Sequence, residues 1–339
     1  MILSRRVLVL GATGGIGGEV ARKLRESGWQ VCALRRGGRP PHEGTEGFIW
    51  FDGDAMNRQQ VMAAAQGCSV IVHAVNPPGY RDWDKRVLPM IDNTIAAAIA
   101  QGATIVLPGT VYNYGPDAFP LLHEDSPQHP VTRKGALRVE LERHLREAST
   151  QGCRVIIVRA GNFFGPVPGN NWFSQGLVKP GRAVTRVLVP SAKGIGNQWA
   201  YLPDVANIMT QLLERRETLA PFAAFHMDGH WDADGRQMAE AIRRVVARHG
   251  GKTPRIKAFP WWLINVLSPF VETFREMQEM RYLWQQPVRL NGAQLQSTLG
   301  REPHTPLDEA VEATLVGLGC VDQSYDALSR RRPAARMRS

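Results

Sequence analysis

The sequence predicts an α/β protein built on a doubly wound parallel sheet, with a smaller α+β domain attached. Apolar strands alternate with helical stretches through the first 160 residues, and a glycine triplet separates the first strand from the first helix. Beyond residue 160 the chain changes to loops rich in Gly, Pro, Asn and Trp. With 339 residues, 43% of them hydrophobic and 21% charged, the composition is that of a globular protein, which excludes disorder, collagen and coiled coil.

Six short runs rich in Val, Ile and Leu have the pattern of strands buried on both faces. They are residues 7–10, 30–34, 48–51, 70–74, 104–107 and 154–158. Apolar residues at helical spacing lie between them and predict helices at residues 16–27, 57–66, 84–101 and 132–149. Strands and helices that alternate at this spacing form βαβ units.

The second half of the chain has weaker strand patterns and four predicted helices, at residues 201–214 (with a strand before it), 235–249, 261–282 and 307–317. We expect one domain from residues 1–160 plus 199–225, and a second, substrate-binding domain from residues 161–198 plus 226–322. Residues 323–339 are expected to be a disordered basic tail, because the last ten residues hold five arginines and no acid.

The net charge of +10 suggests a nucleic-acid partner at first sight. Half of that excess lies in the last ten residues, however, and no aromatic stacking motif accompanies it, so we expect no specific nucleic-acid partner. No apolar run reaches the length of a membrane helix, and the apolar N-terminus continues into glycines as a first strand does, so neither a membrane nor a signal peptide is expected. The four cysteines are widely separated and form no zinc motif, which favours a cytoplasmic protein without a metal.

The first strand is followed by the sequence Gly-Ala-Thr-Gly-Gly-Ile-Gly, with glycines at 11, 14 and 17, which leads into a helix. This is the dinucleotide-binding loop of a Rossmann fold: Gly11 permits the tight turn, Gly14 lets the backbone approach a pyrophosphate, and Gly17 lets helix and strand pack closely. The residues expected to contact the cofactor here are Gly11, Thr13, Gly14, Gly15, Ile16 and Gly17.

The end of the second strand predicts which nicotinamide cofactor is bound. An acid there binds the ribose 2′-hydroxyl, whereas an arginine accommodates a 2′-phosphate. Because the strand ends in Arg35 and Arg36 without an acid, we predict NADP(H), with NAD less favoured. The alternative is that both arginines are solvated surface residues. Asp54, after the third strand, is expected near the adenine amino group.

Several segments of the chain, in the right order, resemble the extended short-chain dehydrogenase/reductases of the NAD(P)-dependent epimerase/dehydratase group. They are the loop at 11–17, the fourth strand at 70–74, the Thr-Val-Tyr-Asn-Tyr-Gly segment at 110–115, the turn at 159–166, the segment at 201–206 and the closing motif at 299–307. The resemblance implies a Rossmann fold, with Ala74 and Val75 at the cofactor and Asn76 at the substrate.

The sequence departs from that family at the catalytic Tyr-x-x-x-Lys pair, where it has Thr132 and Ala136. A threonine hydroxyl is too weak an acid to replace a phenol. Thr132 is expected to cap the helix that follows it.

Thr110 matches the family's active-site Ser/Thr, whose hydroxyl binds the reacting oxygen. Tyr112 is the candidate for a substitute acid, against the alternative that its ring only packs in the loop, and Tyr114 is a second phenol nearby. Lys134 or Arg138 is expected to supply positive charge. His73, at the end of the fourth strand, is expected to be a core histidine.

The substrate side matches the family at Asn162, whereas the arginine that holds a sugar-nucleotide diphosphate is replaced around Asn197 and Gln198. Aromatic and amide residues are plentiful instead, among them Asn171 and Trp172 of one loop, and Tyr80, Trp83, Asn170, Phe173, Trp261, Trp262, Tyr282 and Trp284. Such a set suits a flatter, less charged ligand, although any one tryptophan can equally belong to a domain core or a dimer contact.

The leading hypothesis is therefore an NADP(H)-dependent oxidoreductase or epimerase that acts on a small, weakly charged substrate by hydride transfer, in a chain that can form a homodimer. The alternative is a non-catalytic NADP(H)-binding sensor or regulator on the same fold. Thr110 and the aromatic residues favour chemistry, whereas Thr132 and Ala136 favour its loss.

Overall fold

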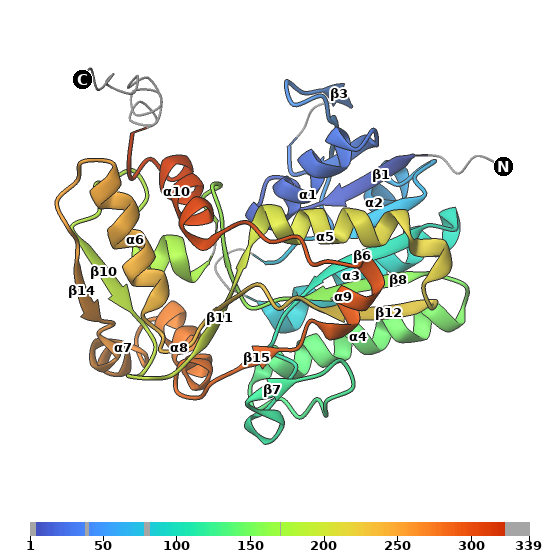
Figure 1. Ribbon diagram of the computed structural model, residues 1–339. Helices are drawn as coiled ribbons and strands as arrows, with labels where there is room; N and C mark the ends of the chain where they lie inside the picture. Colours follow the sequence, from blue (N-terminus) through green and yellow to red (C-terminus); the bar gives the residue numbers. More distant parts are fainter. Residues whose placement is uncertain (1–4, 38–40, 78–81, 170, 323–339) are drawn as a thin grey trace, which may run out of the picture.

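The computed structural model describes residues 5–37, 41–77, 82–169 and 171–322. Within this described part, eight strands form a central sheet in the order β12-β8-β6-β5-β1-β2-β4-β3 (Figure 1), parallel except for the antiparallel pair of β3 and β4. The strands are β1 (Arg6–Leu10), β2 (Gln30–Arg35), β3 (His42–Glu43), β4 (Ile49–Asp52), β5 (Val70–His73), β6 (Thr104–Gly109), β8 (Val155–Arg159) and β12 (Phe222–His226). This is the doubly wound sheet that the sequence predicts.

Helices cover both faces of this sheet, and β1 shows how the sequence divides between them. Val7 and Val9 pack in one core with the helices α1 (Gly15–Glu26) and α5 (Leu202–Glu214). Leu8 and Leu10 point to the opposite face and pack in a second core with three other helices. These are α2 (Arg58–Ala64), α3 (Trp83–Gln101) and α4 (Arg133–Thr150). The strand alternates between faces with period two, and both faces are apolar because both are covered.

A third hydrophobic core, centred on the aromatic residues Phe164, Phe173, Trp199 and Trp284, lies beyond the main sheet. It is enclosed by two small sheets, a one-turn π-helix and flanking helices, shown on the left of Figure 1. These elements are β9 (Asn162–Phe164), the π-helix (Phe173–Leu177), β10 (Arg186–Val189), β11 (Asn197–Tyr201), β13 (His230–Asp232), α6 (Gln237–Arg248), β14 (Arg255–Ala258) and α10 (Leu307–Gly317). The predicted domain boundaries remain predictions.

The remaining elements are short and join the two regions. A two-residue pairing connects β7 (Leu121–Leu122) with β15 (Arg289–Leu290), and α9 (Ala293–Leu299) lies next to β12. Single turns of 3-10 helix lie at Pro116–Ala118, Arg216–Thr218 and Arg281–Trp284.

Two features differ from the sequence-based expectation. The single helix predicted at 261–282 is broken into α7 (Trp261–Leu267) and α8 (Glu272–Glu279), followed by a 3-10 turn. Pro269 lies in the break, where it has no amide to donate and its ring obstructs a continuing helix. The strand predicted at 48–51 is present as β4, whereas its antiparallel partner β3, which has only two residues, was not predicted.

The predicted basic tail, residues 323–339, lies outside the described residues. Within the described ranges, no helix combines the length and the apolar character needed to cross a membrane.

Candidate active site

The glycine-rich loop between β1 and α1 is shaped by close backbone contacts. Gly11 has φ +89°, and a Cβ there would lie 2.5 Å from the carbonyl oxygen of Ala74, so the loop lies against the end of β5. A Cβ on Gly17 would collide with the Gly11 carbonyl. Gly14 caps α1, whose first turn contains no acid, so its N-terminal amides and the helix dipole suit an anion.

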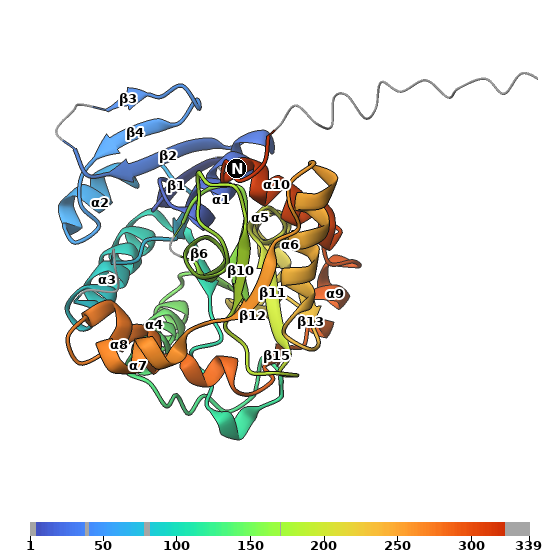
Figure 2. The same ribbon diagram turned by 90° about the vertical axis from the view of Figure 1, so that its left-hand side faces the viewer.

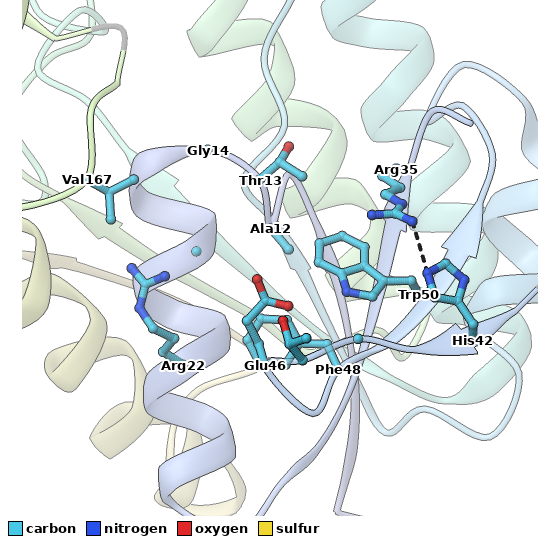
Figure 3. A pocket seen from close by; sticks show the side chains of 13 residues that line it. Ala12, Thr13, Gly14, Arg22, Arg35, His42, Glu46, Phe48, Trp50 and Val167 are labelled. Carbon is cyan, nitrogen blue, oxygen red and sulfur yellow. Dashed lines mark hydrogen bonds between the residues drawn. The ribbon is translucent and has the colours of Figure 1, made fainter. Parts of the chain in front are cut away.

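A cavity of about 520 Å³ opens beside this loop (Figure 3). Ala12, Thr13 and Gly14 form one edge of it, Arg22 of α1 lies on one side, and the β3–β4 hairpin lies on the other. The lining residues from β2 and the hairpin are Arg35, His42, Gly44, Thr45, Glu46, Phe48 and Trp50. Of these, only Arg35 was expected from the sequence, because an unpredicted hairpin supplies the others.

Arg35 lines this cavity with its guanidinium held by three neighbours. Its centre lies 4.9 Å from the ring centre of Trp50, one nitrogen lies 2.9 Å from Nε2 of His42, and Nε lies 3.4 Å from a carboxylate oxygen of Asp52. Figure 3 shows Arg35 and His42 joined across Trp50. The side chain is thus fixed toward the cavity, while Asp52 cancels part of its charge.

The other two residues predicted at the adenosine end lie differently. Arg36 is exposed in the bend after β2 and does not line the cavity. Asp54 is half-buried, and its carboxylate accepts a hydrogen bond from the amide of Met56 at 2.9 Å, so it orders its own turn.

The candidate residues Thr110, Tyr112 and Asn76 follow the carboxyl ends of β5 and β6. Thr110 directly follows β6, and its hydroxyl accepts a hydrogen bond from the amide of Tyr112 at 3.3 Å. Asn76, beyond the end of β5, accepts a hydrogen bond from Arg138 of α4 at 2.8 Å. Because β5 and β6 are parallel neighbours, these groups lie at one edge of the sheet, where doubly wound folds bind ligands.

Tyr112 is half-buried, and its phenol lies near the charge of Arg138. Burial raises the pKa of Tyr112 above its ordinary value, and the positive charge of Arg138 opposes that rise. The phenol is therefore protonated at neutral pH and suited to donate a proton rather than to accept one.

Lys134 is held in a buried ion pair. Its ammonium lies 2.6 Å from a carboxylate oxygen of Glu276 on α8, and both side chains are almost completely buried. Burial lowers the pKa of Lys134, and the charge of Glu276 opposes that fall. Of the two basic residues that the sequence offered, Arg138 is the one whose charge acts on Tyr112, and Lys134 connects α4 to α8.

The first turn of α4 confirms the expected role of Thr132. Its hydroxyl accepts a hydrogen bond from the amide of Gly135 at 3.0 Å, as an N-cap does. Ala136, one turn later, is exposed.

Two further residues considered at the active site are parts of the core. The Tyr114 phenol lies 2.9 Å from Nε2 of His226 and accepts a hydrogen bond from Arg159 at 2.8 Å, and Arg159 is paired with Glu142 at 2.6 Å. Burial raises the pKa of Tyr114 to about 12. His73 is a core histidine, as predicted: it lies 2.8 Å from the Thr94 hydroxyl, and burial lowers its pKa to about 3.

Of the residues predicted to bind substrate, Asn162 begins β9, and Asn171 lies in the segment that approaches Gly15 of the cofactor loop. The Asn162 amide donates a hydrogen bond to the Gln198 carbonyl at 3.3 Å, and Asn171 accepts one from the amide of Ser174 at 2.9 Å. Trp172 packs with the aromatic rings of Phe259, Trp261 and Trp284. Most of the aromatic residues of this region thus belong to the third core, while Tyr80 and Asn170 lie outside the described residues.

Metal binding receives no support from the described ranges, where no group of three His, Cys, Asp or Glu side chains is placed to hold an ion.

Comparison with known proteins gives the chain a family. The sequence model of the NAD dependent epimerase/dehydratase family matches residues 7–226, which is more than half of the chain. No curated protein sequence matches it.

Solved structures share the fold across almost the whole chain. A Burkholderia cenocepacia protein with a provisional epimerase name superimposes with a TM-score of 0.71, at 17% identity, over 94% of this chain and 99% of its own. UDP-glucose 4-epimerase of Bifidobacterium longum, in complex with NAD⁺ and UDP, gives a TM-score of 0.69 at 13% identity over 93% of this chain and 97% of its own. The corresponding Thermotoga maritima enzyme, in complex with UDP-glucose, gives a TM-score of 0.68 at 15% identity, over 96% of this chain and 100% of its own.

Proposed function

Since the chain belongs to the NAD-dependent epimerase/dehydratase family, we propose that it is an NADP(H)-dependent oxidoreductase or epimerase that acts on a small, weakly charged substrate. The family describes enzymes that work with a nicotinamide dinucleotide. The preference for the phosphorylated cofactor, the class of substrate and the residues that carry the chemistry are our inferences.

The cofactor proposal depends mainly on Arg35 and the cavity it lines. The loop from Gly11 to Gly17 offers a glycine cradle and a helix N-terminus for the pyrophosphate. The cavity that continues from the loop presents Arg35 and Arg22, and among the described residues that line it Glu46 is the one carboxylate. A 2′-phosphate placed there would meet guanidinium groups, which bind phosphate well.

The chemistry of the site follows from Thr110, Tyr112 and Arg138. When bound, a nicotinamide would supply or accept the hydride. The Thr110 hydroxyl would donate a hydrogen bond to the substrate oxygen on which charge develops. The protonated Tyr112 would give its proton to that oxygen, and Arg138 would stabilise the phenolate that remains. Because the Tyr112 phenol is protonated at neutral pH, its proton is available for carbonyl reduction, whereas alcohol oxidation would need the phenolate.

A substrate of low charge fits the polar groups that replace the family's arginine. Gln198 is buried, and its amide is committed to the carbonyls of Asp228 and Leu290, so it offers no cation to a diphosphate. Asn162 and Asn76 remain as neutral hydrogen-bonding groups for a substrate.

The non-catalytic alternative also has an observation in its favour. Thr132 is committed to capping α4 and Lys134 to pairing with Glu276, so neither supplies the usual acid and ammonium. If Tyr112 only packs in its loop, the same fold would bind NADP(H) and report on it without turnover.

The cofactor proposal is tested by calorimetric titration with NADPH and NADH. We expect NADPH to bind more tightly and Arg35→Gln to remove about tenfold to a hundredfold of that affinity, because a charge-assisted contact contributes roughly 1.5–3 kcal/mol. Arg36→Gln is the matched control and should change the affinity little. Equal affinities for the two cofactors, or equal effects of the two substitutions, would contradict the assignment.

Turnover is tested with a screen of aldehydes, ketones and alcohols in the presence of NADPH or NADP⁺. Thr110→Val should lower kcat by roughly 10²–10³ with NADPH affinity intact. Tyr112→Phe should lower kcat as well and remove the decline of reduction rate that titration of the phenol causes at high pH. Cofactor binding without turnover of any class would support the sensor instead.

A further inference from the structure

The hairpin of α7 and α8 exposes an unusual amount of apolar surface. Trp262 is 69% exposed, Val266 62% and Phe270 84%, and Leu263 and Val271 are also exposed. From residue 258 to residue 271 the chain has no charged residue. Single exposed apolar side chains are common, but a contiguous set on one helix and its turn marks an interaction site.

The apolar hairpin adjoins a basic surface. In the sheet of β10 and β14, Arg186 pairs in register with Arg255, and Lys257 lies two residues further along β14, so all three project from the same face. All three are exposed, whereas Val187 on the opposite face is buried in the third core. The two parallel strands lie beside the hairpin at the left edge of Figure 1 and face the viewer in Figure 2.

The two chain segments that carry this surface contain no acid, and the first acid after the second of them is Glu272 at the start of α8. The segments 161–198 and 250–271 contain no Asp or Glu, and their basic residues are Lys179, Arg182, Arg186, Lys193, Lys252, Arg255 and Lys257. The amide of Phe259 donates to the Val189 carbonyl at 2.8 Å, and the Trp261 indole donates to the Pro190 carbonyl at 2.8 Å, so the start of α7 is fixed directly to the basic sheet.

We propose that this combined surface, the exposed side chains of α7 and its turn together with Arg186, Arg255 and Lys257, docks on an anionic phospholipid membrane. Exposed Trp and Phe beside Lys and Arg are the composition of segments that lie in the membrane interface: the apolar groups enter the headgroup boundary and the cations meet the phosphates. This binding does not need a spanning helix, and it departs from the sequence-based prediction of no membrane partner.

A second copy of the chain fits the surface less well. A symmetric dimer through one patch places that patch against itself, which would bring the arginines and the lysine of one copy toward those of the other. An anionic bilayer complements both the charge and the apolar residues, and it needs no concave pocket for Trp262 and Phe270.

The test is co-sedimentation of the full chain with phosphatidylcholine vesicles, with and without phosphatidylglycerol. We expect binding to the anionic vesicles only, weakened by salt. Trp262→Ser with Phe270→Ser should lower the affinity roughly tenfold to a hundredfold through lost apolar burial. Arg255→Gln with Lys257→Gln should lower it about thirtyfold, since each basic residue near an anionic surface contributes about fivefold.

The control for these variants is Ile99→Ser on α3, which removes an exposed apolar side chain from another part of the chain and should leave vesicle binding unchanged. All variants should retain the circular dichroism spectrum and NADPH affinity of the wild type, so a failure here is distinct from a failure of the proposed function. The proposal is wrong if the wild type does not bind anionic vesicles, or if the paired variants bind them with the same affinity as the wild type. A dimer that Trp262→Ser and Phe270→Ser dissociate, without vesicle binding, would assign the surface to a second copy.

Discussion

Glu276→Gln tests whether Lys134 is a structural residue or part of the active site. In the wild type the two charges lie 2.6 Å apart, with side-chain exposures of only 3% and 5%. Removing one partner of a buried ion pair costs about 3–5 kcal/mol, because the other charge stays buried without compensation. In Glu276→Gln, Lys134 keeps its hydrogen bond to the backbone carbonyl of residue 276, which is 3.2 Å long in the wild type, and loses the carboxylate at 2.6 Å, while the charge of Glu279 still acts on it.

Substitution of the other partner, Lys134, should lower the free energy of unfolding less. In Lys134→Met, Glu276 still has Arg133 at 3.3 Å, so we expect a loss nearer the 1.5–3 kcal/mol of a charged hydrogen bond. Replacing both residues with Met should be close to neutral, because it removes both desolvated charges. Urea unfolding of the three variants, followed by circular dichroism, completes a double-mutant cycle with a large coupling energy.

The pH dependence gives this prediction a second readout. Burial lowers the pKa of Lys134 in the folded state, so the unfolded chain binds more protons there and stability rises with pH through that window. Without Glu276 the folded pKa falls further. The deficit of Glu276→Gln should therefore shrink as the pH rises toward the ordinary lysine value of about 10.4.

Two results would refute the structural role of Lys134. One is a cost below about 1 kcal/mol for Glu276→Gln, since a buried pair cannot lose a partner so cheaply. The other is a Lys134→Met protein of nearly normal stability whose kcat falls more than about a hundredfold, as the loss of a general acid or base does.

Three further outcomes follow from contacts of the site. Asp52→Asn should raise NADPH affinity severalfold, measured by calorimetry, because it releases Arg35 from a carboxylate 3.4 Å away. Glu142→Gln should lower the free energy of unfolding by about 3–5 kcal/mol, measured by urea unfolding, because it leaves the buried Arg159 without its counter-charge. Thr132→Ala should cost about 1 kcal/mol through the lost helix cap and leave kcat unchanged in a steady-state assay, whereas an effect on kcat alone would place Thr132 in the active site.

The parts of the structure that the sequence could predict are those set by neighbouring residues. The buried strands of the sheet, the glycine turn at Gly11 and the cap at Thr132 each depend on a few consecutive side chains, and all three were predicted correctly. The break at Pro269 was equally local and was missed, because the apolar spacing on both sides of it continues through the proline. The prediction followed the apolar periodicity and did not use Pro269, which should have ended the helix.

The contacts that decide the chemistry are long-range, and periodicity contains no information on them. Lys134 meets a residue 142 positions away, and Tyr114 meets His226 at a separation of 112. Nothing in the local sequence distinguishes a lysine that faces a cofactor from one that connects two helices, because either would lie near the start of the same helix.

The same reasoning explains why the tryptophans were assigned incompletely. An apolar stretch shows that a helix has a face to cover, but not whether the fold covers it. Trp172 and Trp284 are packed in the third core, whereas Trp262, one residue after the partly buried Trp261, points to solvent. Only the tertiary structure separates the aromatic residues that stabilise the domain from those that remain for a partner. The exposed ones lie next to the basic sheet of β10 and β14. If that surface binds anionic lipid, the weakly charged substrate proposed for the neighbouring site would be a compound that partitions into membranes, and the substrate screen should begin with such carbonyls.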